Sequence, residues 1–220
     1  MYLCKKIYMK IQSFTFNLFQ ENTFVLWDNT GDCIIIDPGC YEKNEEKELV
    51  NFIEKNDLNP VKLINTHCHI DHILGNKFVS EKWNLELYMH KTDLPLLEGA
   101  GDIAKMYGFE NYRRSPYPKY FLEEGNVLEF GESKLEILFT PGHAPGHICL
   151  CSKEDKFIVA GDVLFNGSIG RTDLPGGDFD TLIASIKTKL FLLDSETVVY
   201  CGHGPSTTIG KEKLTNLFLQ

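Results

Sequence analysis

The sequence contains the string Thr66-His67-Cys68-His69-Ile70-Asp71-His72, which places three histidines and one aspartate within six residues. The string follows an apolar run, residues 61–65, that predicts a buried strand, and it leads into a helical pattern over residues 71–83. In α/β folds, functional side chains gather where strands end. Imidazole and carboxylate groups at this spacing are typical metal ligands, so the string predicts a metal site.

Three further ligand-type residues stand at the ends of other apolar runs: His143, Asp162 and His203, each directly preceded by a glycine. Functional side chains on converging loops of this kind build sites from distant parts of a chain. Five histidines and two carboxylates exceed the needs of one tetrahedral zinc ion but suit two ions that share a bridging carboxylate. We therefore predict a site for two divalent metal ions.

The rest of the chain alternates strands and helices in two halves, about 9–110 and 120–220. In the first half we predict strands at 11–16, 23–27, 33–36, 61–65 and 86–89, and helices at 45–56, with Asn44 as N-cap, and 71–83. Residues 91–119 form a mixed bridge with helical pieces at 94–97 and 103–106. In the second half we predict strands at 127–130, 135–139, 147–151, 157–160 and 197–200, a helix at 179–193 and a short terminal helix.

This order predicts an α/β fold with two sheets inside and helices outside. The candidate ligands run from His67 to His203, so the two halves must fold together, and we expect a single domain over residues 1–220. An oligomeric state cannot be predicted from these patterns.

Composition narrows the class of protein. The 220 residues carry 31 acidic and 22 basic side chains, a formal charge of −9, which disfavours nucleic acid and anionic membranes as partners. Seven cysteines without a CxxC pair indicate a reducing compartment. Residues 1–10 lack the apolar segment of a signal peptide, so we expect a cytoplasmic protein that starts at Met1 or Met9.

The motifs together resemble the metallo-beta-lactamase superfamily. The resemblance rests on the H-x-H-x-D-H string, on the later histidine, and on the Gly-Asp and final Gly-His pairs. Residues 140–147, TPGHAPGH, and 161–165, GDVLF, resemble the glyoxalase II (hydroxyacylglutathione hydrolase) group. The ending, from Gly202-His203-Gly204-Pro205 to Gln220, is similar to that of its short single-domain bacterial members.

The resemblance implies a four-layer αββα sandwich of two mixed β-sheets flanked by helices. It also implies that His67, His69 and His143 hold one metal, that Asp71, His72 and His203 hold the other, and that Asp162 bridges them. Zinc is the first expectation, and iron and manganese accept the same ligands. Asp71 is the predicted catalytic residue, which would orient the attacking hydroxide.

Such a site supports hydrolysis, in which a metal-bridging hydroxide cleaves a thioester such as S-lactoylglutathione. Arg171 falls where the resemblance implies a contact with the substrate, and an ion pair with Asp173 or Asp178 is the alternative. His147 is expected to hydrogen-bond behind the ligands without binding metal. Asp37 is interpreted either as a residue near the metals or as a plain turn, and Cys68 as a packed side chain.

The main alternative is a persulfide dioxygenase of the same fold, which uses one iron. A β-lactamase fits less well because those enzymes generally lack the bridging aspartate and are exported. A non-catalytic metal protein would be expected to have lost ligands. Only 17 residues follow His203, so the glutathione-binding domain of longer glyoxalase II enzymes is not expected, and the acyl-thiol substrate stays open.

Overall fold

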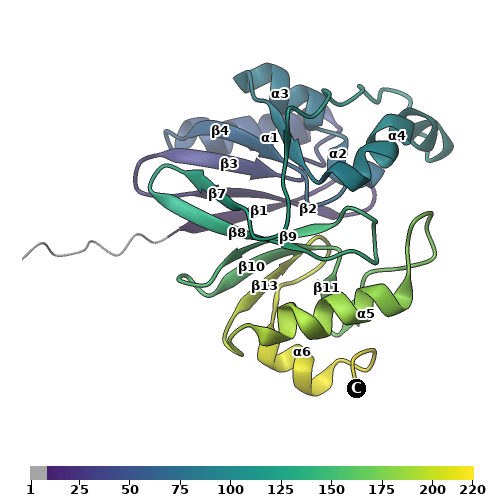
Figure 1. Ribbon diagram of the computed structural model, residues 1–220. Coiled ribbons are helices and arrows are strands. Elements are labelled where there is room, and N and C mark those ends of the chain that lie inside the picture. The colour runs from purple at the N-terminus through teal and green to yellow at the C-terminus, as the bar shows by residue number, and fades with distance from the viewer. Residues whose placement is uncertain (1–8) are drawn as a thin grey trace, which may run out of the picture.

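Two six-stranded sheets face each other in the middle of the molecule (Figure 1). The computed structural model describes residues 9–220, so Met1 and Cys4 lie outside the described residues. In the first sheet the first three strands pair in antiparallel fashion, and the third to the sixth strands pair in parallel. Its strands follow in sequence order: β1 (Lys10–Phe16), β2 (Glu21–Trp27), β3 (Asp32–Ile36), β4 (Asn59–Ile64), β5 (Leu87–Met89) and β6 (Tyr120–Phe121).

The second sheet is also mixed, because β10 and β13 are parallel and its other neighbouring strands are antiparallel. In spatial order it consists of β14 (Thr207–Thr208), β13 (Val198–Cys201), β10 (Phe157–Gly161), β9 (Ile148–Ser152), β8 (Ser133–Phe139) and β7 (Val127–Phe130). A small hairpin of β11 (Leu164–Phe165) and β12 (Ser168–Ile169) stands apart.

Helices cover the outer face of each sheet, which gives four layers (Figure 1). Over the first sheet lie α1 (Lys43–Lys55), α2 (Ile70–Ile73), α3 (Asn76–Trp83) and α4 (Leu94–Met106), and over the second lie α5 (Phe179–Thr188) and α6 (Ile209–Thr215). The predicted αββα sandwich is therefore confirmed. Among the described residues, no helix has the length and apolar character needed to cross a membrane.

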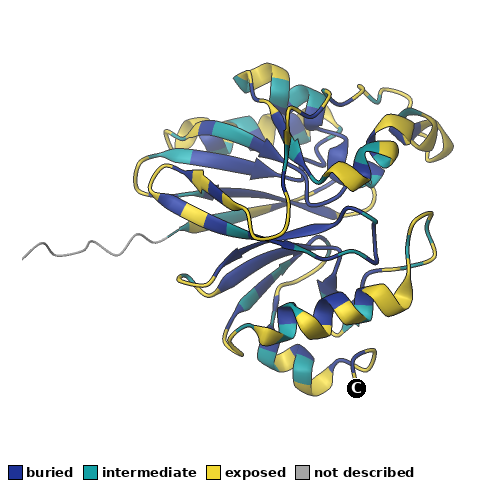
Figure 2. Cartoon of the chain, viewed as in Figure 1, coloured by how far each residue is buried: buried dark blue, intermediate teal, exposed yellow. Residues whose placement is uncertain are grey.

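Alternate residues of the central strands pack into two different cores, one between the sheets and one under the helices. In β3, Ile34 and Ile36 pack between the two sheets, whereas Cys33 and Ile35 pack under the helices. Both faces of the strand are buried, which explains why it reads as a continuous apolar run (Figure 2). Each fully buried side chain of the size of isoleucine contributes about 1.5–3 kcal/mol.

The helix predicted over residues 71–83 is wrong in one respect, because it is interrupted at Gly75. There α2 has ended and α3 has not begun, and the Gly75 N–H donates to the Pro38 carbonyl over 2.7 Å. A Cβ at Gly75 would lie 2.5 Å from Cys40 Sγ. The turn is therefore set by a close approach to a distant loop, which helical periodicity does not report.

Other predicted boundaries also shift. The N-cap of α1 is Glu42, not Asn44, and Glu42 forms a capping box with Glu45. The helix predicted to reach residue 193 ends at Thr188 and is followed by a 3₁₀ turn, Leu190–Leu192. The two helical pieces of the bridge are one helix, α4, and the bridge ends in β6, so the first sheet extends past residue 110.

The carboxyl ends of the strands meet at one edge of the sandwich. In the second sheet β8, β10 and β13 run in the same direction, and in the first sheet β3 and β4 do. Backbone hydrogen bonds join the sheets here: Ile148 N to Thr66 O (2.9 Å) and Asn22 N to Gly202 O (2.7 Å). The loops after these strands therefore converge.

Candidate metal centre

All seven predicted ligands lie together at this edge. Loops after β4, β8, β10 and β13 carry four of the five histidines and Asp162, and α2 carries Asp71 and His72. The seven residues are His67, His69, Asp71, His72, His143, Asp162 and His203. The structure thus brings together side chains that are up to 136 positions apart in the sequence, from His67 to His203.

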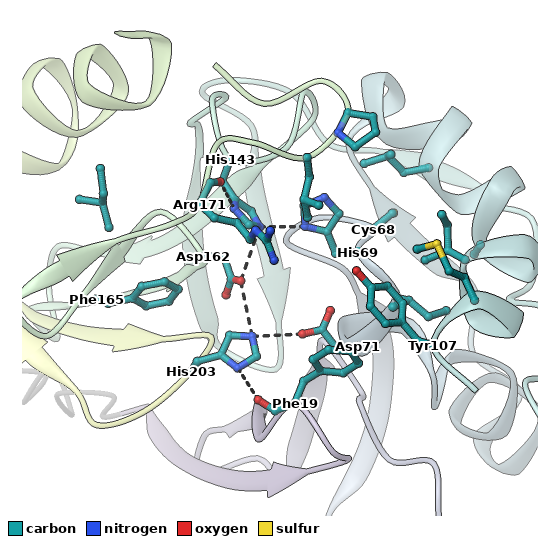
Figure 3. Close-up of a pocket in the computed structure, with 18 of the residues that line it drawn as sticks. Phe19, Cys68, His69, Asp71, Tyr107, His143, Asp162, Phe165, Arg171 and His203 are labelled. Atoms are coloured by element: carbon teal, nitrogen blue, oxygen red, sulfur yellow. Dashed lines mark hydrogen bonds and ion pairs between the residues drawn. The ribbon is translucent and has the colours of Figure 1, made fainter. Parts of the chain in front are cut away.

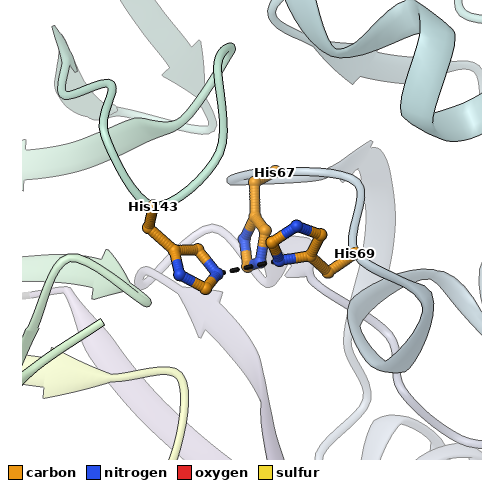
Figure 4. Close-up of side chains that lie close together, drawn as sticks. All are labelled: His67, His69 and His143. Atoms are coloured by element: carbon orange, nitrogen blue, oxygen red, sulfur yellow. Dashed lines mark hydrogen bonds between the residues drawn. The ribbon is translucent and has the colours of Figure 1, made fainter. Parts of the chain in front are cut away.

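His67, His69 and His143 form the first group (Figure 4). Their ligand atoms lie within 4.8 Å of one another, and His69 Nδ1 is 2.8 Å from His143 Nε2. Two nitrogens that share a tetrahedral zinc ion would lie about 3.4 Å apart. His67 Nε2 is buried without a hydrogen-bond partner. This group therefore offers buried imidazole nitrogens converging on one point.

Asp71, His72 and His203 form the second group, again with ligand atoms within 4.8 Å. His203 Nε2 lies 3.1 Å from Asp71 Oδ2, and His72 Nε2 lies 3.7 Å from the same oxygen. His72 Nε2 is buried and has no hydrogen-bond partner.

Asp162 stands between the groups, as Figure 3 shows. Its Oδ1 is 3.4 Å from His72 Nε2, and its Oδ2 is 3.5 Å from both His143 Nε2 and His203 Nε2. Oδ1 is buried without a hydrogen-bond partner. One carboxylate thus faces both groups, which is the position that a bridging ligand needs.

Carbonyl groups fix the orientation of two of the histidine rings. His143 Nδ1 lies 2.7 Å from the Arg171 carbonyl oxygen, and His203 Nδ1 lies 3.0 Å from the Phe19 carbonyl oxygen. A carbonyl only accepts, so each Nδ1 carries the proton and donates it. The lone pair of each Nε2 is thereby left facing the centre, which suits a metal ligand.

Asp37 holds two more rings from behind. It accepts hydrogen bonds from the Thr66 backbone N–H (2.7 Å) and hydroxyl (2.5 Å), and from His72 Nδ1 (3.2 Å). Since the Thr66 hydroxyl donates to Asp37, it accepts from His67 Nδ1 at 3.1 Å. Of the two interpretations of Asp37, the structure favours the one near the ligands.

His147 lies behind Asp162 and not among the seven side chains. Its Nε2 accepts the Asp162 backbone N–H over 3.1 Å, and its Nδ1 is 3.3 Å from Thr140 Oγ1. Its ring stacks on His67, with centroids 4.8 Å apart. The structure therefore gives His147 the supporting position that its place in the sequence predicts.

Two buried carboxylates at the site were not predicted. Glu21 Oε1 lies 3.8 Å from His72 Nδ1 and has no hydrogen-bond partner. Asp93 accepts from the backbone N–H groups of Cys68 (2.9 Å) and Gly146, which belong to the two loops of the first ligand group. Neither carboxylate stands in a motif, so no local signal marks them.

The first group is electrostatically suited to cations. Burial lowers the pKa of His69 to about 3, with His143 adding to the shift, and burial also lowers the pKa values of His67 and His143. These imidazoles are therefore neutral at pH 7 and keep free lone pairs, as metal ligands must.

The carboxylates dominate the second group. Burial alone would lower the pKa of His72, but Asp162 and Asp71 outweigh it and hold that pKa well above its usual range. The same carboxylates raise the pKa of His203 to about 9 against the effect of burial. Negative charge is thus concentrated where a second cation would lie.

The residues fit divalent metal ions. Five imidazoles and two carboxylates are donors that zinc, iron and manganese accept. Buried atoms without a partner are rare in native proteins, yet three of them face this centre: His67 Nε2, His72 Nε2 and Asp162 Oδ1. Metal coordination would satisfy such atoms.

The cluster opens on a pocket of about 660 Å³, within the usual range for small-molecule sites (Figure 3). Arg171 lines this pocket, and its guanidinium forms two 2.7 Å hydrogen bonds with the Asp173 carboxylate. The structure shows the ion pair with Asp173 that was the alternative interpretation of Arg171, and a contact between Arg171 and a substrate stays a prediction. Cys68 is buried with its Sγ 3.7 Å from Met89 Sδ, and burial raises the pKa of its thiol.

Known proteins resemble this chain over almost its whole length. A Haemophilus influenzae protein named hydroxyacylglutathione hydrolase GloC is 39% identical over 212 residues, which cover 96% of this chain and 98% of that protein. A crystal structure of TTHA1623 in a di-iron-bound form has a TM-score of 0.85 and 39% identity, covering 94% of this chain and all of the other. That of BLEG-1 B3 metallo-beta-lactamase has a TM-score of 0.88 and 31% identity, covering 96% and 100%.

The family model of the metallo-beta-lactamase superfamily matches residues 16–203, a span that contains all seven candidate ligands. The resemblance seen in the motifs is thereby confirmed, and with it a metal-dependent hydrolase family. The chain belongs to the metallo-beta-lactamase superfamily.

Proposed function

We propose that this protein is a hydrolase with two metal ions that cleaves thioesters such as S-lactoylglutathione. The observation that carries the proposal is the position of Asp162, whose two carboxylate oxygens face separate groups of ligands within 3.5 Å. The 39% identity to a protein named hydroxyacylglutathione hydrolase supports the thioester class.

His67, His69 and His143 would hold one ion, Asp71, His72 and His203 the other, and Asp162 would contact both. Two bound cations supply hydroxide at neutral pH by lowering the pKa of water, and they polarise the carbonyl that is attacked. Zinc is the first expectation, and the di-iron form of the related TTHA1623 makes iron a strong second.

The chain's own residues orient the reactants. Asp71 lies at the pocket, and its Oδ2 also contacts His203, so it can accept a hydrogen bond from the attacking water and fix its direction. The proposed reaction needs no nucleophilic cysteine. Cys68 is a poor nucleophile in any case, because burial raises the pKa of its thiol and keeps it protonated. Thiolates are good leaving groups, so the reaction does not depend on a strong general acid.

We also propose that the partner is a small-molecule thioester and that the protein works in a reducing compartment such as the cytoplasm. The six cysteines of the described part of the chain support the reducing compartment, because all of them are buried and free.

The test combines elemental analysis with parallel assays on the purified protein. We expect two metal ions per chain and thiol release from S-lactoylglutathione or a simple acyl thioester. Asp162→Ala should abolish thiol release, whereas Asp155→Ala, on the remote turn after β9, should preserve it.

Three results would contradict the proposal. Oxygen consumption with glutathione persulfide, together with one iron per chain, would indicate the dioxygenase. Hydrolysis restricted to a β-lactam would place the activity with that of BLEG-1. Metal binding without turnover of any of these substrates would indicate a non-catalytic metal protein.

A further inference from the structure

One face of α4 forms an apolar wall of the pocket. Leu96, Ala100, Ile103 and Met106 all line it, and they recur every three or four positions along the helix. Residues at this spacing lie on one side of an α-helix. The core contacts of α4 come from Leu97, Ala100 and Ala104, and Leu96 is partly packed against the same core, whereas Ile103 and Met106 lie outside it. The exposed part of the wall, Ile103 and Met106, is therefore not needed to hold the helix in place.

The opposite wall is also apolar. It comes from the hairpin β11–β12 and the loop after it, through Phe165, Ile169, Leu174 and Pro175. The rings of Phe19 and Tyr107 pack edge to face beside the metal-ligand cluster, with their centroids 5.2 Å apart (Figure 3).

Several of these lining side chains are exposed. Met106 is 68% exposed, and Phe19, Ile103 and Tyr107 are each 40% exposed. Contiguous apolar surface of this kind commonly marks a binding site. Its position beside the metal cluster points to the substrate and not to a protein partner.

The pocket offers little to a charged ligand. Arg171 is the one lysine or arginine among the lining residues of the described chain, and Asp173 already neutralises it. A glutathionyl group carries two carboxylates and one ammonium, which need charged or hydrogen-bonding partners when they leave water. The walls provide apolar contacts instead.

We infer that this pocket holds the apolar acyl chain of the substrate, so the preferred substrates are thioesters with a linear chain of several carbons and not those with a short hydroxyacyl group. The inference rests on the thioester hydrolysis proposed above. The biological thiols, glutathione and the pantetheine thiols, are polar, so the apolar arm of a thioester is its acyl group. Water adds to the carbonyl carbon, the C–S bond breaks, and the thiolate takes up a proton to give one carboxylic acid and one thiol.

The test is a chain-length series on the metal-loaded protein. S-acyl N-acetylcysteamine and S-acyl glutathione thioesters with two, four, six and eight acyl carbons are compared by thiol release, with S-lactoylglutathione beside them. Each methylene that enters the pocket should raise kcat/KM about four-fold. The gain should be similar for both thiols. A kcat/KM that does not change with chain length, or that is highest for the lactoyl thioester, would overturn the inference while leaving thioester hydrolysis intact.

Two matched variants locate the effect. Ile103→Asp places a charge on the wall and should reduce kcat/KM for the hexanoyl thioester at least ten-fold, with little change for the acetyl thioester. Leu214→Asp makes the same change at a 79% exposed position on α6 and should alter neither. Equal losses for both acyl groups in Ile103→Asp would contradict an acyl pocket.

Binding without turnover separates the two proposals. Calorimetry with S-methyl and S-hexyl thioethers of N-acetylcysteamine measures affinity for compounds that cannot be hydrolysed. Tighter binding of the hexyl compound in a protein that cleaves no thioester would refute the proposed function but support the pocket. Equal binding of the two compounds would refute the pocket.

Discussion

Asp93 is a buried carboxylate through which we expect the stability of this protein to depend on pH. It accepts hydrogen bonds from the backbone N–H groups of Cys68 and Gly146, and so joins the loop of His67 and His69 to the loop of His143. Burial raises its pKa from 3.8 to about 6, although both hydrogen bonds act in the opposite direction.

The sign of the effect follows from the number of protons bound. Between pH 3.8 and pH 6 the folded protein keeps a proton on Asp93 that the unfolded chain has lost. The free energy of unfolding therefore falls as the pH rises through this window. A shift of about two pKa units at 1.36 kcal/mol per unit gives about 3 kcal/mol in total. Asp93→Asn cannot titrate and removes this term.

The measurement is urea unfolding of the metal-free wild type and Asp93→Asn at pH 4, 5, 6 and 7. Metal is removed because its binding depends on pH, so that loss of metal at low pH would add its own effect on the free energy of unfolding. The wild type should gain about 2–3 kcal/mol over the variant between pH 7 and pH 4. Asp102→Asn, on the exposed face of α4, serves as the control. A stability difference between wild type and Asp93→Asn that is constant with pH would refute the reasoning.

Three other predictions concern the ligands and their supports. Gly142→Ala should destabilise the protein by about 2 kcal/mol or more, because the φ of Gly142 is +129° and a Cβ there would meet the Leu182 backbone. The control, Gly99→Ala, has open space around it in α4 and should stabilise the protein by up to about 1 kcal/mol. Equal effects of the two substitutions in denaturant unfolding would contradict both expectations. His147→Ala leaves the Asp162 N–H unpaired and should weaken metal affinity about 10–100-fold in a chelator competition, whereas unchanged affinity would argue against its supporting role. Removing metal should lower the midpoint of thermal unfolding, and adding metal at a hundred times its Kd should restore about 2.7 kcal/mol of the free energy of unfolding. A midpoint that does not respond to metal would exclude a metal site in the folded protein.

The clustering of the candidate ligands could be predicted from the sequence because their signals are local. His67, His69, Asp71 and His72 fall within one short string, and a glycine directly precedes each of the other three ligands. The strand ends that bring them together follow from the apolar runs, since strands with both faces buried are unmistakably apolar. Local patterns thus sufficed for the candidate centre and for the layers of the fold.

The supporting residues could not be predicted in the same way. Asp93 and Gly146 are 53 positions apart, and Glu21 reaches His72 from the first residue of β2. Nothing near either carboxylate in the sequence distinguishes it from a solvated acidic residue. The break at Gly75 has the same origin, because it depends on the approach of Pro38 and Cys40 from another loop.

The bridge, residues 91–119, gave a third kind of difference, because two glycines and a second apolar face obscured the helical periodicity. The helix α4 contains Gly99 and Gly101, which weaken the helical pattern by about 1 kcal/mol each, and its apolar residues lie on two faces. One face packs into the core between the first sheet and its helices through Leu97, Ala100 and Ala104. The second face, toward the pocket, looks like a departure from amphipathic order until the neighbouring metal cluster is considered.

The centre and the pocket wall thus come from different parts of the fold. The candidate ligands stand on loops at the sheet edges and on α2, and backbone carbonyls and buried carboxylates fix them. The wall is the outer face of α4, whose side chains at Ile103 and Met106 are partly exposed and hold no ligand in place. Substitutions there can change which acyl chain fits without disturbing His67 or Asp162. Related chains with the same ligands can therefore differ in substrate, and the residues of α4 are where that difference should be sought.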